Sequence, residues 1–363
     1  MRILQVCSAS SFGGGERHLA DLSNSLSDSG TNVYVVLRPR SALEPFLTDV
    51  PPSNIFHLSL RNAADIKSAI QISKIAAEIG AEVLHAHLAR DYPIVAVASR
   101  LSNIPFILTR HVLFPMKRVP RLLLRNVSRV IAPSKAVYQR LIDQQTFPSE
   151  TIVLIRNGVD VDRFSAAELK TRDRPTVGTI GHMAHIKGHD VFIKAANIVL
   201  QTRPDVYFRI IGDDKSRSQS NLADMRSLIR TLCLEKNVEL AGWTNDTPAE
   251  LAKMDVFVSA ARSEPFGLVM AEAMASRVPV IATKSEGAVE IVEDGVSGLL
   301  TSVGDEAELA DRILELLADV ELRDRLADAA FERVNEHFSL SRMVKETERL
   351  YASVIGAAAQ PRA

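Results

Sequence analysis

Short apolar runs and amphipathic stretches alternate along the chain. In the first half, six apolar runs are predicted to be strands: Arg2–Val6, Val33–Leu37, Val83–Ala86, Phe106–Thr109, Val130–Ala132 and Ile152–Ile155. Between them, the apolar spacing of three and four predicts helices: Glu16–Leu26, Lys67–Ile79, Pro93–Ser102, a basic helix near Arg118–Asn126 and one from Ser134. Apolar runs that alternate with helices are typical of parallel βαβ units in a doubly wound sheet.

The same alternation restarts after a polar stretch at Phe164–Arg174. The later strands are predicted at Thr176–Ile180, Val206–Ile211, Val238–Leu240, Val256–Ser259, Val278–Ala282 and Gly298–Leu300. The later helices are predicted at Asp190–Gln201, Ser218–Leu232, Pro248–Met254, two within 305–336, and Leu340–Ile355. We therefore predict an α/β protein of two similar domains, residues 1–168 and 169–339, followed by a final helix.

The composition is that of an ordinary globular protein. Of 363 residues, 46% are hydrophobic and 24% are charged. The two cysteines, Cys7 and Cys233, lie in different halves and predict no disulfide framework, which fits a reducing compartment. The first residues lack the full plan of a signal peptide, and no apolar stretch reaches the length of a membrane span. We expect a soluble protein, at most peripheral to a membrane.

The charge is distributed unevenly. The net charge of −1 argues against general nucleic-acid binding, but residues 1–165 carry +6 and the remainder −7. The segment 114–130 contributes five basic residues and no acidic ones: Lys117, Arg118, Arg121, Arg125 and Arg129. Together with Leu122–Leu124, this pattern suggests docking on an anionic lipid surface. A solvated basic face above core-facing leucines has the same pattern and stays open.

A glycine-rich turn follows the first predicted strand. Gly13, Gly14 and Gly15 let the backbone approach a ligand, and the next helix offers free N–H groups to an anion. A simple tight turn explains the glycines equally well. The turn is not the G-x-G-x-x-G fingerprint, and Arg38, not an acid, follows the second strand. An NAD dehydrogenase is therefore disfavoured.

A second glycine-containing turn, Gly181–Gly188, follows the first strand of the second half. Lys187 in this turn suits a pyrophosphate, although a solvated lysine beside a turn is the plainer interpretation. His182, His185 and His189 lie nearby, but their spacing fits no zinc pattern and no cysteine is close. We therefore expect no metal.

Two glutamates mark the segment after the fourth strand of the second half. Glu264 precedes a helix start formed by Phe266, Gly267 and Leu268, whose N–H groups face a ligand. Glu272 interrupts the apolar run VMAEAMA, so its carboxylate needs a partner. Carboxylates beside an anion-binding helix start suit hydroxyl groups, such as those of a ribose and a sugar ring.

His111 follows another strand end, in the sequence ILTRH, and His87 follows a strand in LHAH. A lone histidine at such a place is most often structural, and a functional role stays open for both.

Taken together, these motifs identify a family resemblance. The two glutamates stand in EPFGLVMAE (264–272), a Glu, seven residues, then Glu. The flanking text also matches: IAPSKAV (131–137), RNGVDVDRF (156–164), VGTIGHMAHIKGHD (177–190) and VPVIATKSEGAVEIVEDGVSGLL (278–300). The chain resembles the retaining GT-B glycosyltransferases of family 4, also called group 1, over nearly its whole length. The resemblance implies two Rossmann-like domains facing a central cleft, the first for the acceptor and the second for the donor. The final helix, about 340–363, would pack back on the first domain.

The resemblance also implies roles for residues. Glu264 would bond the donor sugar's hydroxyls, Glu272 the ribose hydroxyls, and Lys187 the diphosphate. The amides of Phe266, Gly267 and Leu268 would assist at sugar and phosphate. The resemblance places Gly13, Gly14 and Gly15 at the phosphates. It places His111 near the anomeric carbon or the acceptor, and Glu290 near the nucleotide.

One position departs from the family pattern. Many members have an arginine where this chain has His182, and a neutral histidine donates only one hydrogen bond. We expect weaker or pH-sensitive donor binding, or another cation nearby. Trp243 lies where the family often places the base of the nucleotide, and no residue there indicates which base is bound.

The implied activity is hexosyl transfer from a UDP-, GDP- or ADP-sugar to a glycan or lipid-linked acceptor, in cell-surface polysaccharide or lipopolysaccharide synthesis. It needs no cofactor and no metal, and its place is the cytoplasm, on the inner face of the membrane where the basic segment docks. A sugar-nucleotide epimerase on the same fold and a non-catalytic sugar-nucleotide-binding protein remain alternatives. A phosphorylase would need a pyridoxal phosphate lysine, for which no motif is present.

Overall fold

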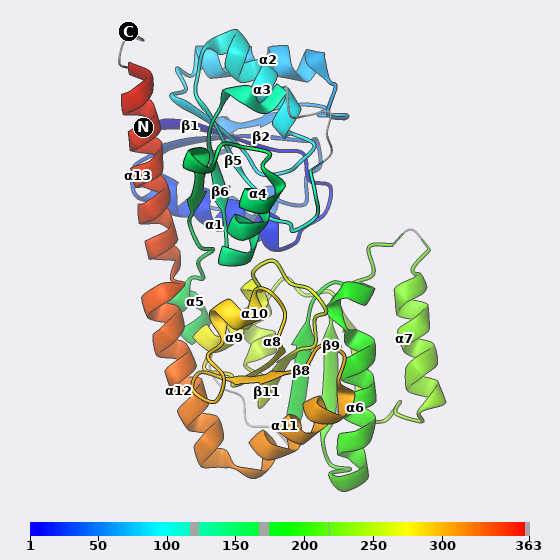
Figure 1. Ribbon diagram of the computed structural model, residues 1–363. Coiled ribbons are helices and arrows are strands. Elements are labelled where there is room, and N and C mark those ends of the chain that lie inside the picture. Colours follow the sequence, from blue (N-terminus) through cyan, green and yellow to red (C-terminus); the bar gives the residue numbers. More distant parts are fainter. Residues whose placement is uncertain (117–122, 167–173, 217, 360–363) are drawn as a thin grey trace. The chain divides into compact units, whose positions relative to one another are not determined.

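The computed structural model describes residues 1–116, 123–166, 174–216 and 218–359. The chain forms two compact units, Met1–Gly158 with Leu340–Ala363, and Val159–Ser339 (Figure 1). The expected domain boundary at 168/169 falls in 167–173, outside the described residues. The last helix of the chain is grouped with the first unit. Each unit contains one parallel sheet, as the alternation of apolar runs predicts.

The first unit is built on a seven-stranded sheet of order β3-β2-β1-β4-β5-β6-β7. All strand pairs are parallel. The strands are β1 Arg2–Cys7, β2 Asn32–Leu37, β3 Ile55–His57, β4 Val83–Ala86, β5 Phe106–Thr109, β6 Val127–Ala132 and β7 Ile152–Leu154. The doubly wound sheet predicted for this half is therefore confirmed, with β3 as an additional edge strand.

Helices cover both faces of the first sheet. One face packs against α2 (Ile66–Glu78), α3 (Tyr92–Ser102) and α4 (Lys135–Gln144). The other face packs against α1 (Gly14–Asp28) and α13 (Leu340–Ala359), which lie side by side (Figure 1). The 3-10 turns are η1 Glu44–Phe46, η2 Pro52–Asn54, η3 Leu123–Asn126 and η4 Ser149–Thr151. The basic α-helix expected near Arg118–Asn126 is thus wrong for its described part, η3, while 117–122 lie outside the described residues.

The C-terminal helix is joined to the first sheet by a buried polar group. Tyr351 of α13 is fully buried, and its hydroxyl accepts a hydrogen bond from Gln5 Nε2 at 3.2 Å. The same hydroxyl lies 2.7 Å from Nδ1 of His85. Because this buried hydroxyl makes two hydrogen bonds to the sheet, it fixes the helix at one position along the sheet.

The second unit is built on a six-stranded sheet of order β10-β9-β8-β11-β12-β13, again parallel throughout. Its strands are β8 Thr176–Ile180, β9 Tyr207–Ile211, β10 Val238–Gly242, β11 Val256–Ser259, β12 Val280–Thr283 and β13 Leu299–Thr301. Each predicted strand of the second half is present, so the predicted Rossmann-like architecture holds for both units.

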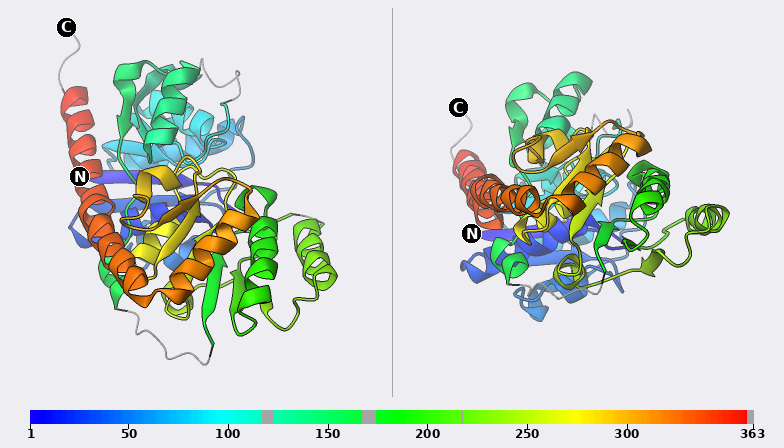
Figure 2. Two further views of the ribbon diagram at one scale, coloured as in Figure 1. Left: turned by 60° about the horizontal axis from the view of Figure 1, so that its bottom comes forward. Right: turned by 90° about the horizontal axis from the view of Figure 1, so that it is seen from below.

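The helices of the second unit also divide between two faces. One core contains α6 (His189–Thr202), α7 (Ser220–Thr231) and α11 (Glu306–Ala318), and α6 and α11 lie side by side (Figure 1 and Figure 2). The other contains α5 (Val161–Ser165), α8 (Thr247–Leu251), α9 (Leu268–Ala275), α10 (Ala288–Ile291) and part of α12 (Val320–His337). The polar stretch expected as a linker begins inside α5, where Phe164 is buried in this core.

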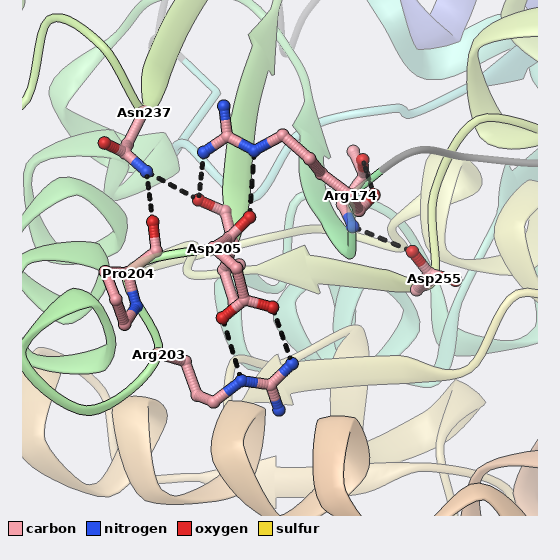
Figure 3. Close-up of polar contacts among 8 residues, drawn as sticks. Arg174, Arg203, Pro204, Asp205, Asn237 and Asp255 are labelled. Carbon is pink, nitrogen blue, oxygen red and sulfur yellow. Dashed lines mark hydrogen bonds and ion pairs between the residues drawn. The ribbon is translucent and has the colours of Figure 1, made fainter.

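Side chains hold the amino ends of the second sheet's strands together (Figure 3). Arg174 donates to the carbonyl of Asp205 at 2.9 Å, and Asn237 donates to those of Pro204 and Val206 at 3.1 and 2.9 Å. Asp255 accepts from the N–H of Thr176 at 2.7 Å. This edge is therefore closed by its own hydrogen bonds, which leaves the carboxyl ends of the strands as the edge for ligands.

Candidate functional site

The strands β8, β11 and β12 are neighbours in the second sheet. Because they run parallel, the segments that follow them lie at the same edge. These segments are 181–188, 260–267 and 284–287. The first two contain the candidates His182, Lys187, Glu264, Phe266 and Gly267, whereas Leu268 and Glu272 lie in the helix after the second segment and Glu290 in the helix after the third.

Lys187 and Glu264 come together at this edge. Lys187 Nζ lies 2.5 Å from Glu264 Oε2, and the two side chains are 30% and 15% exposed. A cation and a carboxylate in contact, both reachable from solvent, provide one group for a phosphate and one for a hydroxyl.

The backbone around Lys187 is tightly fixed. Lys187 ends the 3-10 turn η5 (His185–Lys187), and Gly188 follows with φ +68°. A Cβ atom on Gly188 would stand 1.9 Å from the carbonyl oxygen of Ala260, so the turn packs directly on the chain after β11. Only glycine satisfies both the left-handed backbone and this close approach.

An ion pair fixes the two loops to each other. Arg262 donates to both carboxylate oxygens of Asp190 at 2.8 and 2.7 Å, and to the carbonyl of His185 at 2.7 Å. The hydrogen bond from Arg262 lowers the pKa of Asp190 below its usual value, with burial opposing it. The pair is therefore charged at neutral pH and holds the Lys187 turn beside the Glu264 loop.

Glu286 shapes the Glu264 loop and was missed by the sequence analysis. Its carboxylate accepts from Ser263 Oγ at 3.1 Å and from the N–H of Glu264 at 3.2 Å. The N–H of Gly287 donates to the carbonyl of Glu264 at 2.8 Å, and a Cβ on Gly287 would lie 2.1 Å from the carbonyl oxygen of Phe266. The only signal was the placement of Glu286 beside a glycine after a neighbouring strand.

The helix α9 starts at Leu268, with Gly267 as its N-cap at φ +100°. A Cβ on Gly267 would lie 3.3 Å from Cγ of Glu264, so this helix start is next to the Lys187–Glu264 pair. The first N–H groups of a helix have no acceptor within the helix and carry the positive end of its dipole. Phe266 is buried under the turn.

Glu272 lies one turn into α9 and is only 5% exposed. Its neighbours in the helix, Ala271 and Ala273, are fully buried. Glu290 lies in the short helix α10, partly buried, and Arg333 donates to its carbonyl at 3.1 Å. Both carboxylates thus belong to elements that pack against the second sheet near the Glu264 loop.

His182 has polar partners in the second unit. Its Nδ1 lies 2.9 Å from Asp213 Oδ1, and its ring stacks on Trp243 at 5.6 Å with an 11° tilt. Lys215 forms an ion pair with Asp213 and lies 5.1 Å from the centre of the Trp243 ring. Burial alone would raise the pKa of Asp213, but hydrogen bonds from Lys215 and His182 outweigh it and lower the pKa. Lys215 is therefore a cation near His182 that the sequence analysis did not single out.

In the first unit, the glycine turn overlaps the start of α1. Gly13 is the N-cap with an extended backbone, which any residue adopts, and α1 begins at Gly14. A Cβ on Gly14 would meet nothing within 4 Å, whereas one on Gly15 would lie 3.4 Å from the ring of His111. The turn after β1 and the segment after β5 therefore meet, and the tightest approach is at Gly15.

Three histidines gather at this place: His111, His87, which follows β4, and His18 of α1. The His18 ring lies 4.8 Å from that of His111 and 5.8 Å from that of His87. One ring nitrogen from each of the three lies within 4.8 Å of the others. The sequence singles out His87 and His111, each by its place after a strand, but not His18, because nothing in the helical pattern of α1 distinguishes it.

Burial keeps these histidines neutral. It lowers the pKa of His18 to about 4 and those of His87 and His111 well below their usual value, with the neighbouring histidines adding to the effect for His87 and His111. A neutral imidazole has one N–H donor and one lone pair. Each ring can thus exchange one proton or bind one ligand without first losing a charge.

The basic segment is described only in part. Lys117, Arg118 and Arg121 lie outside the described residues, whereas Arg125 is exposed in η3 beside the buried Leu124. At the start of the segment, Phe114 is 67% exposed. Within the described residues, no helix is long and apolar enough to cross a membrane.

The protein is of the GT-B class, because it has two units with parallel sheets and a lysine–glutamate pair beside the start of a helix. Two family models match the chain: Glycosyltransferase Family 4 over residues 12–163 and Glycosyl transferases group 1 over residues 160–333. The chain belongs to this family and is a glycosyltransferase.

Known relatives agree with this assignment. The lipopolysaccharide core biosynthesis glycosyltransferase LpsE of Rhizobium meliloti is 28% identical over 94% of this chain and 96% of its own. The crystal structure of Anabaena HepE in complex with UDP and glucose has a TM-score of 0.85 at 26% identity, covering 97% of this chain and all of that one. A glycosyltransferase from Rickettsia africae has the same fold, with a TM-score of 0.86 at 23% identity over 98% of each chain.

Proposed function

We propose that the protein transfers a hexose from a UDP-sugar to a glycan or lipid-linked acceptor, with retention of the anomeric configuration, in the synthesis of a cell-surface polysaccharide or lipopolysaccharide. The observation that carries the proposal is the Lys187–Glu264 pair at the start of α9. The names of LpsE and of the HepE complexes with UDP and UDP-glucose support the acceptor class and the base, respectively.

The second unit holds the donor in this proposal. Lys187, Lys215 and the first amides of α9, from Phe266, Gly267 and Leu268, stabilise the charge that grows on the leaving diphosphate. Glu264 accepts from hydroxyls of the sugar. Glu272 accepts from the ribose hydroxyls, and Glu290 binds near the nucleotide. Trp243 offers a flat surface to the base, and His182, whose ring stacks on Trp243, faces the diphosphate.

The first unit serves the acceptor and the reacting carbon. His111 is neutral, so it can donate or accept a single hydrogen bond at the anomeric centre without repelling a cationic transition state. Gly15 allows the turn after β1 to lie against the His111 ring, and the amides of Gly13, Gly14 and Gly15 are offered to phosphate oxygens. The acceptor hydroxyl attacks from the side that the diphosphate leaves, with a phosphate oxygen taking its proton.

The same proposal includes transfer without a divalent ion or other cofactor. The donor residues supply two lysines and a helix start for the diphosphate, which is the charge that a metal would otherwise neutralise. The test is nucleoside diphosphate release from UDP-, GDP- and ADP-sugars in excess EDTA. Release from UDP-sugars at the rate measured with magnesium supports the proposal, and loss of release in EDTA overturns its metal-free part.

The stereochemistry separates the proposal from its alternatives. Proton NMR of the product formed from an α-linked donor should show an α-linkage, and a β-linkage would refute retention. An epimerase would convert the sugar nucleotide without any acceptor. A binding protein would bind the UDP-sugar and release no UDP even with acceptor extracts present.

We further propose that the protein works in the cytoplasm at the inner face of the membrane, where the basic segment and Phe114 meet anionic lipid. The exposed Arg125 and Phe114 support this. Vesicles containing phosphatidylglycerol should sediment the protein at low salt, and neutral vesicles should not. Equal sedimentation with both would refute the electrostatic docking.

A further inference from the structure

The histidine cluster of the first unit, His18, His87 and His111, has three unsatisfied ring nitrogens. They are Nδ1 of His18, Nδ1 of His87 and Nε2 of His111, each buried and without a hydrogen bond to any described residue. Burying a polar atom without a partner costs free energy, so three such atoms in one place point to a ligand. The ligand must satisfy several nitrogens at once, because one ring nitrogen from each histidine lies within 4.8 Å of the others.

The hydrogen bonds around His87 determine which of its nitrogens carries the proton. Gln5 Nε2 donates to the Tyr351 hydroxyl at 3.2 Å, so the Gln5 Oε1 atom, 2.8 Å from His87 Nε2, is an acceptor. His87 therefore donates from Nε2, and its Nδ1 atom presents a lone pair. A histidine that binds a metal through one ring nitrogen usually donates a hydrogen bond from the other, often to a carbonyl oxygen.

The neighbouring His85 shows the contrast. Its Nδ1 lies 2.7 Å from the Tyr351 hydroxyl and its Nε2 lies 2.8 Å from Thr109 Oγ1. Both of its nitrogens are therefore engaged, and it stands outside the cluster although its ring is only 4.1 Å from that of His87. His85 is therefore a structural histidine, whereas His18, His87 and His111 each have one ring nitrogen without a hydrogen bond to the described residues.

Burial lowers the pKa of His18, and a contact with the neighbouring Asn157 side chain raises it by a smaller amount. The Asn157 Oδ1 atom is buried and has no hydrogen-bond partner among the described residues. If His18 donates from Nε2 towards this oxygen, its Nδ1 atom also presents a lone pair. A single water can donate to two lone pairs only, whereas one cation can accept a lone pair from each of three nitrogens.

We propose that His18, His87 and His111 form a binding site for one divalent transition-metal ion of the zinc type, with a fourth position left to water. Three imidazole ligands and one open position are a known ligand set for zinc, with Zn–N distances of about 2.0–2.1 Å. A tetrahedral site of that size places the nitrogens about 3.3 Å apart. The cluster, whose nitrogens lie within 4.8 Å of one another, therefore needs to contract by no more than about 1.5 Å to hold the ion.

This site is distinct from the histidines of the second unit that the sequence analysis considered for a metal. It also shares no residue with the donor site. An ion bound here occupies the free nitrogen of His111 and so inhibits transfer while leaving UDP binding unchanged. That inhibition rests on the proposed function, whereas the binding of the ion does not.

The test is calorimetric titration of the EDTA-stripped, dialysed full-length protein with zinc chloride. We expect one ion per chain for the wild type and for the control His57→Gln, which changes an exposed histidine of the same unit. His18→Gln and His87→Gln should each weaken zinc binding at least about 100-fold, and Gln5→Leu about 10- to 100-fold. A far-ultraviolet circular dichroism spectrum and a thermal denaturation midpoint like those of the wild type show that each variant is folded.

Cobalt provides a second readout, since Co²⁺ bound by three imidazoles gives visible absorption bands that the two histidine variants should lack. Wild-type protein that binds zinc no more tightly than His87→Gln, or a His57→Gln variant with the same loss, overturns the proposal. In the transfer assay, zinc should inhibit the wild type reversibly. If the protein has no transferase activity, the zinc and cobalt titrations still decide the site.

Discussion

Replacing Lys187 by methionine removes one of the two cations proposed for the donor site and keeps a side chain of similar length. Two unit charges about 4 Å apart attract each other by about 4 kcal/mol at an effective dielectric constant of about 20. The loss of one preorganised group that stabilises transition-state charge costs about 3–4 kcal/mol, which is about 100- to 1000-fold in rate. We therefore expect kcat/KM for transfer from the UDP-sugar to fall by this factor in Lys187→Met.

The same change has a small effect on stability. The Lys187 and Glu264 side chains are both partly exposed, so their ion pair contributes no more than about 1 kcal/mol to folding. Steady-state kinetics and thermal denaturation of Lys187→Met should be compared with those of Lys194→Met, an exposed lysine of α6. A kcat/KM within threefold of the wild type would refute the assignment of Lys187, and so would an equal loss in Lys194→Met.

Three further substitutions probe other parts of the account. Tyr351→Phe removes a buried hydroxyl with two hydrogen bonds, so urea denaturation should show a loss of about 1–3 kcal/mol in the first unit, and unchanged stability would contradict the role of α13. Gly188→Ala combines a clash with a left-handed backbone and should cost roughly 2–4 kcal/mol, whereas Gly242→Ala, with φ +78° and open space around it, should cost about 1 kcal/mol; equal losses would refute the packing argument. His182→Arg adds a permanent cation and should tighten UDP binding about tenfold by calorimetry, whereas weaker binding would show that His182 does not face the diphosphate.

The sequence was sufficient for most of the fold because buried parallel strands are continuous apolar runs. Strands β4, β5, β8 and β11 have the predicted bounds. The edge strand β3 was missed because Ile55–His57 is short and half-exposed, so its pairing with β2 leaves little mark on the pattern. The described part of the expected basic α-helix is the 3-10 turn η3, because Leu124 alone reaches the core there.

The candidate site was only partly predictable for a related reason. Lys187 and Glu264 stand in recognisable motifs, but their contact depends on β8 and β11 being neighbours, which tertiary structure decides. Glu286 and His18 were missed because each looks like an ordinary polar residue of its own segment. Their importance comes from what folding places beside them.

The central claim, a UDP-sugar site in the second unit, is tested most directly by calorimetric titration with UDP in EDTA. The variants to compare are Glu272→Gln, which changes a buried carboxylate with little change in volume, and the exposed control Glu321→Gln. The account predicts equal binding by the wild type and Glu321→Gln, and binding at least about tenfold weaker by a folded Glu272→Gln, since a hydrogen bond to a charged group contributes about 1.5–3 kcal/mol. No binding of UDP by the wild type, or equal binding by all three proteins, would contradict it.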